Sequence, residues 1–555
     1  MPLRPLIPFW LTAAIGLGGR RRQQQIRLAK LRRSWGREIP RERDLGIIAM
    51  YFSSLGTDRK TVNEQTWRDL GMDDLFAKVD RTCSTPGRQV LYSQLRTYLE
   101  DDRALAERAR EQEVFAADQD LRESCQLLLA RLNAPGEQWL ASLLLNPFPP
   151  APGFAPLLYL CSFLSVACLA GIAFVHFLIL PALLLLLGNA IISATYTRSI
   201  APYFDGFSQI VALLGVSEEL AKIPNGQALP QLDYARQASP WVRALRAKLG
   251  WLAVDRTTVN DLATSAFGYL NMLFLYDAMV YLRSLAILRQ HQAALVGLFE
   301  ATGSLDAAIA VASYLQSLPR FARPKLVAGR GLEFAGLYHP LLAGAVSNSL
   351  HLADRSALIA GPNMAGKTAF IRTVGINLIL AQTLNLCLAE RGEFPRAIVR
   401  SSIRREDDLL AGQSYFFTEI QQIAEFTQLE GDEQLCLFLI DEIFRGTNTI
   451  ERIASSAAVL RHLGQRQLVL ATTHDVELQE LLADTFDLYH FSDQMVDGSY
   501  RFDYRIQAGP ARSRNAIKLL EISGYPSSII REAEALAARF AEPADVRPTS
   551  GEPKS

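Results

Sequence analysis

Gly361-Pro362-Asn363-Met364-Ala365-Gly366-Lys367-Thr368 is the stretch that decides the fold of the carboxy-terminal part of this 555-residue chain. It matches the phosphate-binding pattern G-x-x-x-x-G-K-[ST]. An apolar run at 357–360 precedes it and predicts a strand, and a helical pattern at 369–384 follows it. A strand, a glycine-containing loop and a helix in this order predict an α/β P-loop domain with a parallel sheet.

The residue types in this loop suit the binding of ATP with Mg²⁺. Glycines let backbone N–H groups approach phosphate oxygens, and the amino-terminal end of the following helix favours an anion. Lys367 would bring its positive charge to the β- and γ-phosphates, which makes it a predicted catalytic as well as binding residue. The Thr368 hydroxyl would be a ligand of Mg²⁺. The six residues from Gly361 to Gly366 would line the nucleotide.

Two further apolar runs end in polar residues. The run 435–440 leads to Asp441 and Glu442, and the run 467–472 is followed by Thr473 and His474. Carboxylates at the end of a buried strand are costly without a role, so we expect Asp441 to hold Mg²⁺. Glu442 would orient or deprotonate the attacking water. His474 is predicted to contact the γ-phosphate or this water, and the alternative is a purely structural histidine.

The chain is too long for one ordinary core, and the spacing of its apolar residues changes along its length. Helical spacing dominates before about residue 324, and short apolar strands alternate with helices after it. The predicted divisions are an anchor and basic helix (1–45), a first helical part (46–150), a transmembrane hairpin (151–198), a second helical part (199–323), the P-loop ATPase domain (324–541) and a disordered tail (542–555).

The segment from Phe154 to Tyr196 contains 43 residues and no Lys, Arg, Asp or Glu. One bilayer crossing needs about 20 apolar residues, so this length predicts two helices, near 156–175 and 177–196. The alternative is a helical hairpin buried in a soluble domain, but such helices normally carry a polar stripe. The predicted location is the cell membrane, crossed more than once, with the ATPase domain on the cytoplasmic side.

The first 45 residues combine an apolar run with a basic one. Leu6 to Gly19 is apolar and is followed by ten Lys or Arg against two Glu between Arg20 and Arg43. The apolar run predicts a third anchor, with an interfacial helix as the alternative. The basic run is typical of a juxtamembrane helix, and binding to anionic lipid or nucleic acid is the other reading. Over the whole chain the formal net charge is zero, so composition alone indicates no polyanionic partner.

Four ordered motifs resemble those of the MutS family of DNA mismatch repair ATPases. Gly361 to Met364 is similar to that family's form of the loop, and the block 441–449 to its Walker B segment. Ala471-Thr472-Thr473-His474 is similar to its switch histidine segment. The fourth motif resembles the family's signature segment and consists of Asp407, Asp408, Leu409, Gly412, Ser414, Phe416 and Glu419.

Weaker similarity surrounds these motifs. The stretch 80–88 resembles the opening of the family's helical core and lever, and 509–535 its helix-turn-helix dimerisation element. The resemblance implies a homodimer with composite ATP sites, in which Ser414 of one subunit reaches the partner's nucleotide. It also places Tyr504 near the adenine, and it implies DNA as a partner.

The chain also departs from the family pattern. Ala365 replaces a glycine of the loop, and Phe444 replaces a small residue before Arg-Gly-Thr, so turnover is expected to differ. About 60 soluble residues precede the core-like opening, which predicts that the mismatch-reading domain is missing. The apolar hairpin interrupts the helical core.

Three functions fit these observations to different degrees. The first is a membrane-anchored, MutS-like ATPase whose helical arms hold DNA. The second is a membrane-bound, ATP-driven switch or scaffold for protein partners, without DNA binding. A transport ATPase is disfavoured, because Leu-Ser-Gly-Gly-Gln is absent and two spans do not form a transport path. The helical parts contain no basic, aromatic-interleaved stripe, so DNA binding follows from resemblance alone.

Overall fold

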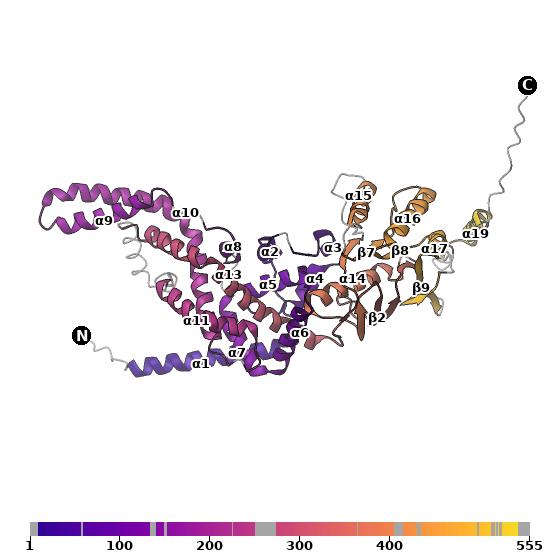
Figure 1. Cartoon of the computed structure of the whole chain (residues 1–555), viewed down its shortest axis with the longest axis horizontal. Helices are drawn as coiled ribbons and strands as arrows, with labels where there is room; N and C mark the ends of the chain where they lie inside the picture. The colour runs from indigo at the N-terminus through magenta and orange to yellow at the C-terminus, as the bar shows by residue number, and fades with distance from the viewer. Residues whose placement is uncertain are drawn as a thin grey trace, which may run out of the picture. The chain divides into compact units, whose positions relative to one another are not determined.

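The computed structural model describes residues 9–541, apart from residues 57–58, 134–139, 149–151, 225, 250–273, 363, 404–414, 430–433, 497–498, 512–516, 518–519 and 521–523. The chain forms two compact units (Figure 1). The helical unit contains residues 1–61, 73–319 and 382–385. The α/β unit contains residues 62–72, 320–381 and 386–555.

Helices of very different length make up the helical unit. Among the described residues they are α1 (Phe9–Ser34), α2 (Leu45–Ser53), α4 (Met72–Val79), α5 (Thr85–Arg96), α6 (Asp102–Ala117), α7 (Gln119–Leu129), η1 (Ala130–Leu132), α8 (Leu140–Leu145), α9 (Ala155–Gly171), η3 (His176–Leu178), α10 (Ile179–Leu220), α11 (Pro230–Leu249) and α13 (Tyr276–Ser317). The described part of the apolar run, from Phe9, and the first part of the basic run, up to Ser34, share one helix, α1.

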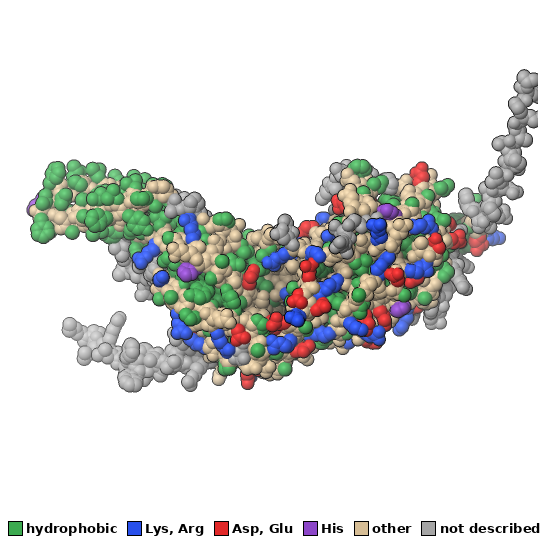
Figure 2. Space-filling model, viewed as in Figure 1, with side chains coloured by type: hydrophobic (Ala, Val, Ile, Leu, Met, Phe, Trp, Pro, Cys, Tyr) green, Lys and Arg blue, Asp and Glu red, His purple; other side chains and the backbone are tan. Residues whose placement is uncertain are grey.

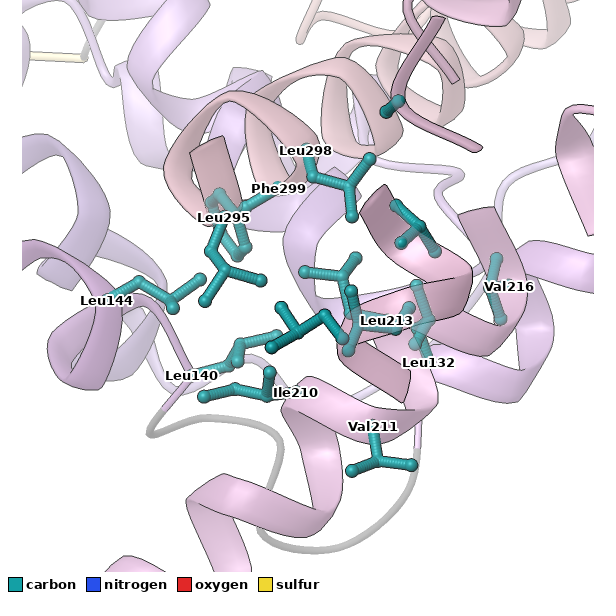
Figure 3. Close-up of a cluster of buried hydrophobic side chains, with 14 of the residues drawn as sticks. Leu132, Leu140, Leu144, Ile210, Val211, Leu213, Val216, Leu295, Leu298 and Phe299 are labelled. Atoms are coloured by element: carbon teal, nitrogen blue, oxygen red, sulfur yellow. The ribbon is translucent and has the colours of Figure 1, made fainter. Parts of the chain in front are cut away.

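The core of the helical unit lies where α8, the second half of α10 and the middle of α13 meet. Leu140, Ile210, Leu213, Leu295 and Leu298 are at most 1% exposed and lie together in Figure 3. Burial of this apolar surface is the main stabilising contribution, at about 25 cal/mol per Å². The two long helices, α10 and α13, therefore contribute the framework of this unit.

Most of the first half of α10 lies outside this core, although Ile192 and Tyr196 pack against it. This half of α10 pairs with α9 as a hairpin, in which the Asn189 side chain donates to the Ser165 hydroxyl at 2.9 Å. The outward side chains are large and apolar: Phe163 is 68% exposed and Leu184 62%. Figure 2 shows a nearly continuous hydrophobic surface over this hairpin. The helix boundaries differ slightly from the predicted ones, because residues 172–178 form the turn.

By length and composition, two described helical stretches are apolar enough to cross a membrane. They are His176–Tyr196, whose most apolar part is 17% buried, and Ala278–Ser317, at 67% buried. The helix α9 is apolar but shorter. The second stretch is a core helix of the helical unit and was not among the predicted spans.

The α/β unit is built on a six-stranded sheet of order β10-β9-β4-β8-β7-β6. Its strands are β4 (Ser356–Ala360), β6 (Ile398–Ser402), β7 (Cys436–Asp441), β8 (Leu468–Thr473), β9 (Phe486–Val496) and β10 (Ser499–Ala508). The strands from β9 to β6 pair in parallel, and β10 is antiparallel to β9. The sheet is therefore mixed, and the prediction of a parallel sheet was wrong for β10. Only two residues separate β9 from β10, which is too short for the crossover that parallel pairing needs.

The helices of this unit are α14 (Lys367–Leu384), α15 (Tyr415–Gln428), α16 (Thr449–Gly464), α17 (Val476–Leu482), α19 (Ser527–Ala541) and, from far upstream in the sequence, α3 (Glu64–Asp69). A second sheet, of order β1-β5-β2-β3, was not predicted. Its strands are β1 (Lys325–Leu326), β2 (Leu332–Leu337), β3 (Asn348–Leu352) and β5 (Arg391–Phe394).

The short helix α3 lies against β6, at the end of the large sheet. The buried Asp69 carboxylate accepts hydrogen bonds from the Ser401 hydroxyl at 2.7 Å and from the Ile403 backbone N–H at 3.1 Å. Burial raises the pKa of Asp69 to about 6, although these donors oppose the shift. A covered edge strand cannot pair with another chain, so α3 closes the sheet on this side.

Candidate nucleotide-binding site

The loop that follows β4 requires glycine at two of its positions. Gly361 has a φ of +141°, and a Cβ there would lie 2.7 Å from the backbone oxygen of Phe491. Gly366 has a φ of +99°, and its Cβ would meet the Tyr504 ring at 3.2 Å. Ala365, in contrast, is fully buried and is not among the residues of positive φ. An alanine therefore fits this position of the loop without backbone strain.

Lys367 lies at the first residue of α14 and is 2% exposed. Its ammonium group donates to the carbonyl oxygens of Gly361 at 2.5 Å and Pro362 at 3.0 Å, and lies 3.9 Å from the Glu442 carboxylate. Burial lowers the pKa of Lys367, and the two carboxylates nearby, at Glu442 and Asp441, oppose this shift. The charge is thus placed inside the loop, where phosphate oxygens would replace the carbonyl oxygens.

Thr368 and Asp441 meet at the carboxyl end of the sheet. The Thr368 hydroxyl donates to Asp441 Oδ2 at 2.8 Å, and the Thr472 hydroxyl from β8 donates to Asp441 Oδ1. A hydroxyl beside a carboxylate provides the oxygen ligands that Mg²⁺ prefers, and Mg²⁺ usually completes its shell with water and phosphate oxygens. The two residues therefore fit a Mg²⁺ ion that is bound together with a nucleotide.

Three basic side chains surround the Glu442 carboxylate. They are Arg445 at 2.8 Å, His474 at 3.5 Å through Nδ1, and Lys367. Burial alone would raise the pKa of Glu442, but the hydrogen bond from His474 and the charges of Lys367 and Arg445 together lower it. The carboxylate is therefore ionised at neutral pH, as a group that accepts a proton or a hydrogen bond from water must be.

The remaining predicted site residues are partly exposed or lie outside the described residues. Met364 is 76% exposed at the tip of the loop, and His474 is 38% exposed beside Glu442. Tyr504 is half-exposed, and its ring lies beside Gly366. Asn363 and Ser414 lie outside the described residues, as do Asp407, Asp408, Leu409 and Gly412 of the signature segment.

Sequence reasoning missed several groups that contribute to this site. Thr472 and Arg445 were quoted only as parts of motifs, yet Thr472 bonds Asp441 and Arg445 pairs with Glu442. A pocket of about 340 Å³ also opens beside the loop, and no sequence pattern predicted it. Its lining combines the loop with the β9 and β10 strands and consists of Gly361, Pro362, His490, Phe491, Ser492, Ala508, Gly509, Pro510 and Ala511.

Residue Phe444 is the other departure noted in the sequence, and it is strained where Ala365 is not. Its φ is +58°, a conformation that glycine adopts far more readily. The ring is only 7% exposed and packs in the apolar cluster around β7, α15 and α16. The side chain thus adds buried apolar surface at a position where the backbone alone would favour a glycine.

Comparison with known proteins places this site in a recognised domain type. Residues 357–541 match the family profile of MutS domain V. The chain is 30% identical over 226 residues to the DNA mismatch repair protein MutS of Thermus thermophilus, which is 40% of this chain and 27% of that protein. Similar relatives are the MutS proteins of Thermus aquaticus, 30% identical over the same shares, and of Streptococcus suis, 30% identical over 38% of this chain and 25% of that protein.

The aligned part spans about a quarter of the length of these curated relatives. The family profile covers most of the loop's neighbourhood: residues 357–541 include the 361–368 loop, Asp441 and Glu442. Residues 357–541 of this chain are therefore similar to domain V of MutS.

Proposed function

We propose that this chain hydrolyses ATP with Mg²⁺ at the site formed by the 361–368 loop, Asp441 and Glu442. The observation that carries the proposal is the arrangement of Glu442, an ionised carboxylate at a strand end between Lys367 and His474. Lys367 and the loop N–H groups would bind the phosphates, and Thr368 and Asp441 would hold the ion. Bound Mg²⁺ would neutralise charge on the phosphates. Glu442 would orient the attacking water and accept its proton, with His474 placing the carboxylate.

Two substitutions separate binding from hydrolysis. Lys367→Ala should abolish or nearly abolish ATP binding, because the lysine acts on phosphates already present in the ground state. Glu442→Ala should keep ATP bound without turnover, because the carboxylate acts on the water. Lys325→Ala and Glu480→Ala are matched controls, since both side chains are exposed in the same unit and neither is assigned a part in the nucleotide site. ATP turnover by Glu442→Ala at the parent rate would contradict the assignment.

The same site supports a homodimer. Large apolar side chains of this unit are exposed in the loop and on α15 and α16, with Met364 at 76%, Phe417 at 53% and Ile450 at 78%. Exposed apolar side chains of this size fit a surface that is covered by a partner. In the composite arrangement, Ser414 of each subunit would complete the partner's site. Mixing Lys367→Ala subunits with Ser414→Ala subunits should then restore part of the ATPase activity, because one interface keeps both intact residues. Confirmed mixed dimers without recovery would contradict composite sites.

The apolar hairpin of α9 and α10 is proposed to anchor the protein in the cell membrane, with the ATPase domain in the cytoplasm, where ATP is available. Its outward side chains are uncharged and exposed, and membrane lipid is the partner that such a surface fits. The apolar part of α1 would be a further anchor.

Binding of DNA is proposed from the relatives alone, whose names describe mismatch repair. The motifs of this chain include no apolar side chain in a setting suited to insertion between base pairs at a mismatch. The affinities for matched and mismatched duplexes should therefore lie within about threefold of each other. Competition between the two duplexes at fixed salt tests this expectation. A tenfold mismatch preference would show a reading element, and no binding at low salt would favour the switch or scaffold for protein partners.

A further inference from the structure

The turn that carries Glu442 has a backbone conformation that residues other than glycine rarely adopt. Glu442 and Phe444 have φ angles of +52° and +58°. Each such residue costs about 1 kcal/mol or more, and the conformation persists only where surrounding groups impose it. The groups that hold this turn therefore determine where the Glu442 carboxylate points.

Hydrogen bonds hold this turn from two directions. On the side of β8, the Glu442 backbone N–H donates to the Thr472 carbonyl oxygen at 3.2 Å. On the side of α15, the Phe444 backbone N–H donates to Glu419 Oε1 at 2.7 Å. Glu419 is only 7% exposed, so this bond is made where water competes little.

The helix that presents Glu419 is itself fixed to the sheet. One turn further along α15, the Gln422 side chain donates to the Ser401 carbonyl oxygen of β6 at 2.7 Å. After it, Phe426 stacks on Phe438 of β7 with ring centroids 4.6 Å apart. Residues 419, 422 and 426 share one face of the helix by their spacing. Glu419 is thus a carboxylate on a rigid support, aimed at the turn.

We propose that Glu419 is a positioning residue that keeps the strained turn in shape and thereby directs the Glu442 carboxylate toward the attacking water. The proposal rests on the proposed ATP hydrolysis.

Three variants of the full-length protein test this role. Glu419→Ala removes the acceptor, Glu419→Gln keeps an acceptor oxygen at the same length, and Glu425→Ala removes an exposed carboxylate from the same helix as a control. For Glu419→Ala we expect kcat to fall at least about tenfold while the dissociation constant for ATP changes less than about threefold. Glu419→Gln should recover kcat to within about threefold of the parent, and Glu425→Ala should match the parent.

Hydrogen exchange of the peptide 441–446 in the nucleotide-free protein gives a readout that needs no turnover. Exchange should accelerate at the Phe444 amide in Glu419→Ala and stay at the parent rate in the other two variants. Parent-like kcat with parent-like exchange in Glu419→Ala would overturn the proposal, and so would equal losses of ATP binding and kcat. A parent protein that binds ATP without hydrolysing it would refute the proposed function, while the exchange rates would still decide whether Glu419 holds the turn.

Discussion

The two longest helices among the described residues, α10 and α13, have the same length of 42 residues and opposite environments. Both contain a stretch apolar enough to cross a membrane. In α13 most of this stretch is buried among other helices, whereas in the first part of α10 only 17% of it is buried. Hydropathy and length therefore do not distinguish a core helix from a candidate span in this chain.

Charge distribution does distinguish them. The stretch 154–196 contains no ionisable group except Tyr and Cys side chains and His176, while α13 carries Arg283, Arg289, Glu300 and Asp306. A core helix of a soluble unit needs a polar side and can bury an occasional charge if it is bonded. A helix that faces lipid has neither requirement.

The first prediction concerns the distribution of the protein between the membrane and soluble fractions. The intact protein should sediment with membranes and resist alkaline extraction, and deletion of Phe154 to Tyr196 should release most of it, with a remainder held through Leu6 to Gly19. Fused to a soluble reporter, residues 154–196 should make the reporter membrane-integral, whereas residues 276–317 should not. The uncharged length of the first segment is the reason.

Recovery of the intact protein in the soluble fraction after gentle lysis would refute the lipid environment of α10. Membrane integration of the 276–317 fusion would refute the distinction by charge.

The second prediction compares matched truncations. Leu298 on α13 is 1% exposed, and Leu184 on α10 is 62% exposed. Leu298→Ala should lower the free energy of unfolding by about 2 to 5 kcal/mol, because it leaves a cavity in the core. Leu184→Ala should change it by less than about 0.5 kcal/mol in detergent. Chemical denaturation of the two variants in the same detergent is the measurement, and equal losses would place Leu184 in a packed core.

The loop, Asp441 and Glu442 were expected at one edge of a sheet, and the structure brings them together there, while their roles in an ATP site stay predictions. The loop, Asp441 and Glu442 could be recognised because phosphate and Mg²⁺ chemistry restricts residue types at fixed spacing. The strand ends that carry them also follow from short apolar runs. Thr472, in contrast, acts through a hydrogen bond to Asp441, 31 residues away in the sequence, and nothing local marks such a contact.

The elements that the sequence did not predict also depend on contacts between residues far apart in the chain or on segments too short to show a pattern. The β10 strand was expected in a parallel sheet because helix and strand alternation was extended past β9, where the connection is too short for a crossover. The small sheet of β1, β2, β3 and β5 escaped notice because its strands are two to six residues long. The position of α3 against β6 depends on contacts across more than 300 residues, such as that of Asp69 with Ser401.

The third prediction uses the buried charge of α13. The Asp306 carboxylate accepts from the Ser84 backbone N–H at 2.7 Å and from the Cys83 backbone N–H at 3.0 Å. Burial nevertheless raises its pKa from the ordinary value of 3.8 to about 6. The folded state therefore holds this proton more tightly than the unfolded state, so the stabilising contribution is complete below about pH 4 and is lost as the pH rises through about 6.

Asp306→Asn removes this titration. The difference in the free energy of unfolding between parent and variant should shift by on the order of 2 kcal/mol between pH 4 and pH 7, with the parent relatively more stable at the acidic end. Denaturation at several pH values measures the shift, and because other groups titrate in both proteins they cancel in the difference. A pH-independent difference would contradict the raised pKa. No equivalent effect is expected from the buried Asn189 of α10, because its side chain does not ionise.

The smallest predicted effect concerns that asparagine. Asn189 is 1% exposed and donates to the Ser165 hydroxyl at 2.9 Å, while Ser165 itself donates to the Cys161 carbonyl oxygen at 2.8 Å. Between helices in lipid, a side-chain hydrogen bond stabilises by about 0.6 kcal/mol on average, because the separated helices find other partners. A double-mutant cycle of Asn189→Ala and Ser165→Ala in bicelles should therefore give a coupling energy of about 0.6 kcal/mol. A coupling energy above about 2 kcal/mol would indicate that neither side chain finds another hydrogen-bond partner when the helices separate, as is expected in a core like that around α13. A coupling energy of zero would show that this hydrogen bond does not join α9 to α10.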